Sequence, residues 1–175
     1  MKQIPRRNPL LPADIAVQVQ EWKILGKPRQ GGVDWNLASW VKEFQEHEEF
    51  LTQLKKKNLG LLDRNTVHVV VRDCLDRGEL EVAFLVVMIW GFGFRGYGRF
   101  RSNKIIEDKA FKSSLEKTVE SLNKGDVIGA YEHLIENGPD GLGCAFGSKF
   151  LYFAAPKDLK NYPLIMDSLV AIAIN

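Results

Sequence analysis

The stretch YEHLIENGPDGLGCAFGSKFLYFAAP, residues 131–156, places a glycine-rich turn between two segments that can form helices. Gly141, Gly143 and Gly147 allow another molecule to approach the backbone closely. The segment after the turn is apolar and aromatic, and the N–H groups at the start of a helix are suited to bind a phosphate. The stretch therefore predicts a helix, a hairpin and a second helix over 148–155, a unit that can hold DNA backbone without reading its sequence.

Lys149 follows Gly147 and Ser148, so we expect it in the first turn of that second helix. The positive end of the helix dipole disfavours another positive charge there, and apolar neighbours such as Phe150 exclude water from the amine. Both effects favour the neutral amine, which is the form that attacks carbon. The alternative is a lysine that contacts only a phosphate or solvent.

Asp167 lies eighteen residues after Lys149, within the apolar segment YPLIMDSLVA. It is well placed to cap a helix beginning at Ser168, where N–H donors and the helix dipole keep a carboxylate ionised. One interpretation is that Asp167 only caps this helix. The other is that it holds a negative charge beside a reaction centre that becomes positive.

Apolar residues recur at helical spacing through most of the remaining chain. The expected helices cover 34–57, 64–76, 79–91, 107–123 and 127–138. Asp34 or Asn36 can cap the first, and Asp63 and Asp126 can cap the second and the last. For 64–76 a strand is the competing prediction, because its valines favour strands. Helices joined by short loops predict an all-α fold.

The first 33 residues are rich in proline and glycine, so we expect 1–33 to form an extended arm with a short helix around 13–24. The remainder, 34–175, is expected to be one helical domain with its own core. Cys74 and Cys144 show no metal-ligand spacing, which favours a metal-free protein in a reducing cytoplasm. The longest apolar run is too short to span a bilayer.

The segment GFGFRGYGRFRS, residues 91–102, is expected to form a glycine-rich, aromatic and basic loop. The net charge of the chain is only +2, but four cations and no acid lie between Phe92 and Lys104. A local basic segment of this kind indicates a polyanionic partner better than the total charge does.

The combination GLGCAFGSKFLYFA and YPLIMDSLVA resembles the helix–hairpin–helix DNA glycosylases, and most of all prokaryotic proteins with an 8-oxoguanine DNA glycosylase fold. The upstream segment MIWGFGFRGYGRFRS is similar to a glycine- and arginine-rich segment of those proteins. The resemblance covers roughly residues 64–172 and is specific in the last 30. It implies a helical glycosylase-like domain in which Lys149 is the nucleophile and Asp167 is the catalytic aspartate.

The activity that the resemblance implies is DNA N-glycosylase, with AP lyase activity as an extension, acting on a flipped-out base of double-stranded DNA. The base is damaged or modified, and the role is base-excision repair or defence against modified foreign DNA. The expected protein is a cytoplasmic monomer that needs no cofactor and no membrane. The residues expected to contact DNA are Gly141, Gly143, Gly147, Ser148, Arg95, Tyr97, Arg99 and Arg101.

Two features depart from the pattern of these glycosylases. Lys149 lies six residues after Gly143 instead of two, so the hairpin is longer or Gly147 takes over the role of the second glycine. The chain also stops eight residues after Asp167, where relatives continue, so we expect a shortened C-terminus. A non-catalytic helix–hairpin–helix DNA-binding protein is the alternative function, and a structural or interaction protein is a further one.

Overall fold

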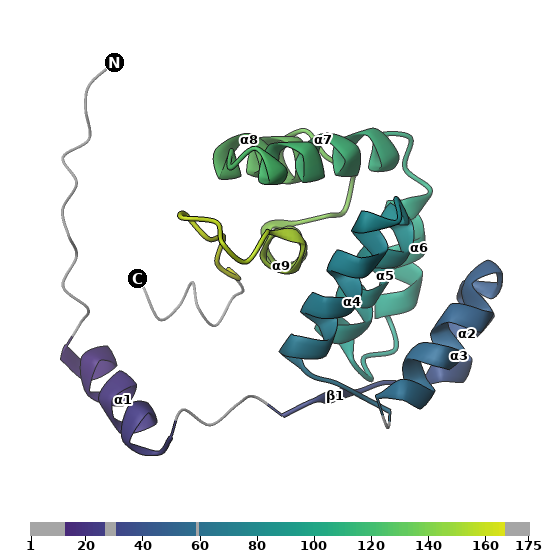
Figure 1. The fold of residues 1–175 in the computed structure, drawn as a ribbon. Coiled ribbons are helices and arrows are strands. Elements are labelled where there is room, and N and C mark those ends of the chain that lie inside the picture. Colours follow the sequence, from purple (N-terminus) through teal and green to yellow (C-terminus); the bar gives the residue numbers. More distant parts are fainter. Residues whose placement is uncertain (1–12, 27–30, 59, 167–175) are drawn as a thin grey trace. The chain divides into compact units, whose positions relative to one another are not determined.

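The computed structural model describes residues 13–26, 31–58 and 60–166 (Figure 1). It divides the chain into two compact units, Met1–Gly31 and Gly32–Asn175. In the first unit, α1 (Ala13–Ile24) coincides with the short helix predicted around 13–24. The division into an arm over 1–33 and a domain over 34–175 stays a prediction.

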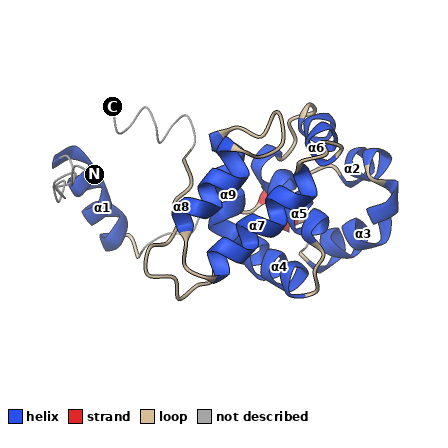
Figure 2. Cartoon of the chain, turned by 90° about the horizontal axis from the view of Figure 1, so that it is seen from above, coloured by secondary structure: helices blue, strands red, loops and turns tan. Residues whose placement is uncertain are grey.

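The described part of the second unit is built almost entirely from helices, which confirms the predicted all-α class (Figure 2). Its elements are β1 (Val33–Asp34), α2 (Leu37–Glu43), a 3-10 turn (Gln45–His47), α3 (Glu48–Lys57), β2 (Leu61–Leu62), α4 (Arg64–Asp76), α5 (Leu80–Phe92), α6 (Gly98–Ile106), α7 (Phe111–Asn123), α8 (Val127–Tyr131), a π-helical turn (Glu132–Glu136) and α9 (Cys144–Ala154). The strands β1 and β2 pair antiparallel. None of the described helices is both long and apolar enough to cross a membrane.

Helix α5 forms the centre of the second unit. All residues from Ala83 to Ile89 are fully buried, because α5 packs against α4, α6, α7 and α9. The ring of Phe84 meets Phe111 of α7 edge-on, with 5.1 Å between the ring centroids, and lies 6.0 Å from Phe150 of α9. Helix α5 is apolar on nearly every face, and it is covered by other helices on several sides, as its sequence predicts.

Helix α4 settles the choice between strand and helix for residues 64–76. The carboxylate of Asp63 accepts a hydrogen bond from the N–H of Thr66 at 2.7 Å, as an N-cap does. Gly78, with a φ of +77°, follows the helix and lets the chain turn toward α5. The capping signal therefore outweighs the strand propensity of the valines.

The single helix predicted over 34–57 is wrong. Asp34 belongs to β1, and α2 begins only after Asn36, whose side chain accepts a hydrogen bond from the N–H of Ser39 at 2.9 Å. The helix stops at Phe44, whose backbone leaves the helical region at φ −126° and ψ 63°. Phe44 is buried and stacks on Trp40 at 5.9 Å between ring centroids. The end of α2 thus coincides with the burial of Phe44, and helical periodicity alone does not reveal this end.

The loop predicted over 91–102 is also shorter than expected, because α6 begins at Gly98. A Cβ on Gly98 would lie 2.3 Å from Cγ of Phe92, so this glycine allows the start of α6 to pack on the end of α5. Gly93, with a φ of +54°, provides the turn between the two helices. The next helix, predicted over 107–123, begins only at Phe111.

The central position of α5 predicts the effect of two phenylalanine substitutions. Phe84→Ala is expected to lower the free energy of unfolding by about 3–5 kcal/mol, because it empties a fully buried site between α5, α7 and α9. Phe94→Ala is the matched control and should change it by less than about 0.5 kcal/mol, because that side chain is exposed. Urea unfolding measures the free energy of unfolding of both variants. Equal decreases in the two would contradict the assignment of α5 to the centre of the second unit.

Candidate DNA-binding and catalytic site

Lys149 lies in the second turn of α9, and its side chain is buried. The predicted helix start at 148 is wrong, because α9 begins at Cys144 and Gly143 is the residue before it. Lys149 is therefore the sixth residue of the helix. The dipole effect is concentrated in the first turn, so the helix start does not account for an unusual amine at Lys149, whereas burial does set this side chain apart from a solvated lysine.

The amine of Lys149 contacts its own helix. Its Nζ donates a hydrogen bond to the carbonyl of Ala145 at 2.9 Å and lies 5.2 Å from the ring centroid of Phe146. A Cβ on Gly91 of α5 would lie 2.7 Å from the Phe146 ring and 3.4 Å from Cδ of Lys149. Gly91 therefore leaves the space in which Phe146 and the lysine stem fit against α5.

Phe146 connects Lys149 to the basic segment. Its ring stacks on Phe92 with 4.1 Å between the centroids, and the guanidinium of Arg101 lies 6.0 Å from the same ring. Arg101 also donates two hydrogen bonds, of 2.8 and 3.2 Å, to the carbonyl of Gly141. The structure thus brings together α6, the glycine-rich turn and α9, which the sequence suggested only as separate DNA-binding candidates.

Gly147 and Ser148 are buried, so the expectation that they contact DNA stays a prediction that their burial does not favour. The N–H of Gly147 is bonded to the carbonyl of Gly143 at 3.0 Å, and a Cβ on Gly147 would lie 2.5 Å from Cγ1 of Ile135. Gly147 therefore allows α9 to pack closely on the π-helical turn. A contact with phosphate at Gly147 or Ser148 would require these buried groups to give up their partners inside the protein.

Ser148 has an internal partner that its sequence position does not reveal. Its Oγ accepts a hydrogen bond from the backbone N–H of Met166 at 2.9 Å. Asp167 follows Met166 in the sequence but lies outside the described residues, and so does the helix predicted to begin at Ser168. The last described residue before Asp167 is therefore held beside the residue that precedes Lys149.

Gly141 and Gly143 remain exposed, as a phosphate site requires. Gly141 has a φ of +85°, which favours glycine, and Gly143 precedes α9 with no side chain to cap the helix. The N–H of Asp140, just before them, is bonded to the carboxylate of Asp108 at 3.2 Å. The exposed glycine backbone of the turn thus has the carboxylate of Asp108 close to its preceding residue.

The basic segment presents aromatic side chains to solvent. Phe94, Tyr97 and Phe100 are 65%, 69% and 43% exposed, and the rings of Tyr97 and Phe100 lie 5.7 Å apart. Arg95 is exposed beside them, Arg99 donates to the carbonyl of Gly96 at 2.8 Å, and Nζ of Lys104 lies 4.8 Å from the Phe100 ring. We call this set of residues the α6 aromatic surface.

Two further groups near α9 escaped the sequence analysis, because their members are distant in the chain. The guanidinium of Arg64 lies 5.6 Å from the ring centroid of Trp90 and 5.7 Å from that of Tyr152. The second group joins His68 to Tyr162, with 2.6 Å between Nε2 and the hydroxyl oxygen. No spacing motif in the sequence indicates either group.

The described part of the chain holds two other candidates for reactive or metal-binding groups. Burial raises the pKa of the Cys74 thiol to about 11, which opposes a thiolate there. Glu46, His47 and Glu81 place their ligand atoms within 4.8 Å of one another. Glu81 stands near the start of α5 and Gly91 near its end, about 15 Å along the helix. This cluster is therefore separate from the lysine site.

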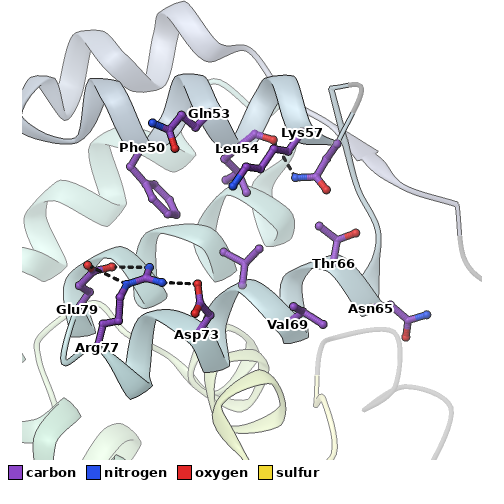
Figure 3. Close-up of a pocket in the computed structure, with 12 residues that line it drawn as sticks. Phe50, Gln53, Leu54, Lys57, Asn65, Thr66, Val69, Asp73, Arg77 and Glu79 are labelled. Atoms are coloured by element: carbon purple, nitrogen blue, oxygen red, sulfur yellow. Dashed lines mark hydrogen bonds and ion pairs between the residues drawn. The ribbon is translucent and has the colours of Figure 1, made fainter.

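A groove of about 730 Å³ lies between α3 and α4 (Figure 3). Phe50, Leu54 and Val69 contribute apolar side chains to it. Arg77, at one end, is paired with both Asp73 and Glu79, so its charge is already balanced. Lys149 does not line the groove, which leaves the groove outside the proposed chemistry.

Burial of His68 predicts a dependence of stability on pH. Burial lowers the pKa of His68 below its ordinary value of 6.5, so the unfolded chain binds a proton before the folded protein does. The contribution of His68 to the free energy of unfolding is thus present above about pH 6.5 and lost as the pH falls below it. We expect the free energy of unfolding to decrease from about pH 7 to about pH 5, with a smaller decrease in His68→Phe.

Urea unfolding across this pH range measures the effect. Phe94→Ala, which removes an exposed side chain and no titratable group, is the control and should keep the slope of the wild type. A slope that His68→Phe leaves unchanged would contradict a neutral, buried His68.

Comparison with known proteins gives one family. Residues 26–175 match the model of the family described as "Putative 8-oxoguanine DNA glycosylase OGG-like protein". Comparisons with curated proteins and with solved structures gave no match. The matched range includes every element from β1 to α9, with Lys149 and Asp167 inside it. The chain therefore belongs to this OGG-like glycosylase family, and its helical architecture is the glycosylase-like fold that the family implies.

Proposed function

We propose that this protein is a DNA N-glycosylase that excises a damaged or modified base with Lys149 as the nucleophile. The observation that carries the proposal is the burial of Lys149 on α9 beside the Phe146 ring, which also contacts Arg101, the side chain bonded to the exposed glycine turn. Family membership supports the glycosylase class and a DNA substrate. A lysine that served only as a phosphate contact would not need burial against Phe146 and Gly91.

Excision requires the target nucleotide to leave the duplex. Arg95, Arg99 and the backbone at Gly141 to Gly143 are proposed to hold phosphates on either side of that nucleotide. Tyr97 and Phe100 are proposed to stack on bases or to occupy the gap left by the flipped base. Their exposure supports this role, because these rings contribute little to the core.

The chemical step begins with loss of a proton from Lys149. The contacts of Nζ with the Ala145 carbonyl and the Phe146 ring are ones that a positively charged amine makes. We propose that the carboxylate of Asp167 accepts this proton, passes it on to the departing base and, ionised again, faces the positive charge that develops on the sugar. The amine then attacks C1′, the bond from C1′ to the base breaks, and the electron pair leaves with the base, which takes up a proton.

The amine nucleophile implies a second activity. The sugar ring opens and the C1′ adduct becomes a Schiff base, from which β-elimination breaks the bond to the 3′ phosphate. We therefore extend the proposal to AP lyase activity. Excision of 8-oxoguanine would indicate base-excision repair, and excision of modified cytosines would indicate defence against foreign DNA.

Borohydride trapping tests the nucleophile. Wild-type protein is expected to form a covalent adduct with a duplex that carries an abasic site or the correct base, because borohydride reduces the Schiff base. Lys149→Gln should abolish the adduct, and Lys117→Gln, an exposed lysine on α7, should leave it unchanged. Denaturing gels over duplexes with 8-oxoguanine or modified cytosines measure the adduct and identify the substrate.

The trapping experiment also separates the enzyme from a non-catalytic DNA-binding protein. Binding without an adduct on any duplex would contradict the lysine mechanism and favour the binding protein. An adduct that persists in Lys149→Gln would assign the chemistry to another amine.

The α6 aromatic surface predicts a dependence of binding on salt. The double variant Arg95→Gln/Arg99→Gln should weaken DNA binding and reduce the slope of log K against log salt by about 1.8, because each lost phosphate contact removes about 0.9. Fluorescence anisotropy with a labelled duplex over a salt series measures the slope. Lys112→Gln/Lys117→Gln, with two exposed lysines on α7, is the control and should keep it. Equal slopes in the arginine variant and the wild type would remove this surface from the DNA interface.

A further inference from the structure

We propose that Ser148 is a positioning residue, whose hydroxyl fixes the backbone at Met166, the residue that precedes Asp167 in the sequence. The inference deepens the proposed function and rests on it, because it gives a role to a side chain that touches neither DNA nor the reacting atoms. Ser148 immediately precedes Lys149 on α9, and Met166 immediately precedes Asp167. The two proposed catalytic groups would thus be related through one hydrogen bond.

The geometry at Ser148 fits such a role. Its side chain is buried, and Oγ accepts the N–H of Met166 at 2.9 Å. The carbonyl oxygens of Met166 and Ala145 lie 3.3 and 3.5 Å from Oγ. The hydroxyl proton of Ser148 therefore has one acceptor at Met166 and one in α9. Because Ser148 belongs to a helix, its position is set by the packing of α9, and Met166 is held to that helix.

The rest of the segment between α9 and Met166 is anchored in the same way. Arg72 of α4 donates to the carbonyl of Ala154 at 2.8 Å, which fixes the point where α9 ends. Tyr162 donates its hydroxyl proton to the carbonyl of Tyr152 at 2.8 Å, so His68 must be the donor in the 2.6 Å contact between Nε2 and that hydroxyl. Burial raises the pKa of Tyr162 to about 12, which keeps this proton in place.

These anchors matter because the described part of the segment, residues 155–166, contains no helix or strand. Without such an element, its path depends on side-chain hydrogen bonds to α4 and α9 and on the burial of Ala155 and Pro163. The anchor at Met166 is the last one before Asp167. A displacement of about 1 Å at a catalytic group can lower a rate about 100-fold, so loss of this one bond is expected to act on the chemical step.

The test uses Ser148→Ala in the full chain, with single-turnover excision on the base that the wild type removes best. The excision rate is expected to fall about tenfold or more, while the dissociation constant for DNA stays within about twofold. Asp167→Asn should also lower the rate. In the double variant, Ser148→Ala should cause no further loss, because Ser148 acts through Asp167.

Ser114→Ala is the matched control. Ser114 and Ser148 are both 4% exposed, and the hydroxyl of Ser114 donates to the carbonyl of His133, away from Met166. Its loss should affect stability but leave the excision rate unchanged. An equal loss of rate in both serine variants, an additive loss in the Asp167→Asn background, or no loss in Ser148→Ala would each overturn the proposal.

Hydrogen exchange keeps the inference independent of activity. Exchange of backbone amides in residues 156–166 should be faster in Ser148→Ala than in the wild type and unchanged in Ser114→Ala. A wild-type protein that excises no base would refute the proposed function, and exchange would then decide on the anchor alone. Unchanged exchange in Ser148→Ala would refute the anchor even in an active enzyme.

Discussion

The close approach of α9 to the C-terminal end of α5 is the constraint on which the candidate site depends. It is possible because Gly91 has no side chain, since a Cβ there would lie 2.7 Å from the ring of Phe146. Phe146 can then stack on Phe92 and offer its ring to both Arg101 and Lys149. The fully buried centre of α5 fixes the helix against which α9 packs. The absence of a side chain at one position of α5, Gly91, therefore determines where the amine of Lys149 lies.

The same contact explains how the exposed and the buried parts of the site are connected. Arg101 reaches from α6 to the carbonyl of Gly141, so the basic segment and the glycine turn do not depend on separate anchors. On the opposite side of α9, Gly147 admits Ile135 and Ser148 holds Met166. Helix α9 is thus fixed on several sides by contacts that leave the turn before it exposed. Such an arrangement suits a group that must be held in place while a flexible polymer binds beside it.

The sequence predicted the elements whose signals are local. Asp63 and Asp126 cap α4 and α8 as expected, and the continuous apolar run marks α5 as the buried centre. The breaks that depend on tertiary packing were missed, at Phe44, where a buried ring accompanies the end of α2, and at Gly98, where α6 packs on Phe92. The sequence also singles out Lys149, which the structure buries, and it assigns Gly147 and Ser148 to DNA, where the structure gives them partners inside the protein. Their partners, Ile135 and Met166, are 12 and 18 residues away, and nothing in a local pattern names them.

The buried amine also constrains the order of events in the proposed reaction. In the resting protein Nζ of Lys149 is bonded to the carbonyl of Ala145, one turn earlier in the same helix. An amine in this position is shielded from solvent and has a partner, so attack on C1′ requires both the loss of a proton and the exchange of the Ala145 contact for the substrate. Only a nucleotide that has left the duplex can come close enough to a buried side chain to make that exchange. In the proposed reaction, burial of Lys149 would therefore act as a selection step, since bases that remain stacked would not meet the nucleophile, and bases that flip out readily, as damaged and mispaired ones do, would meet it most often.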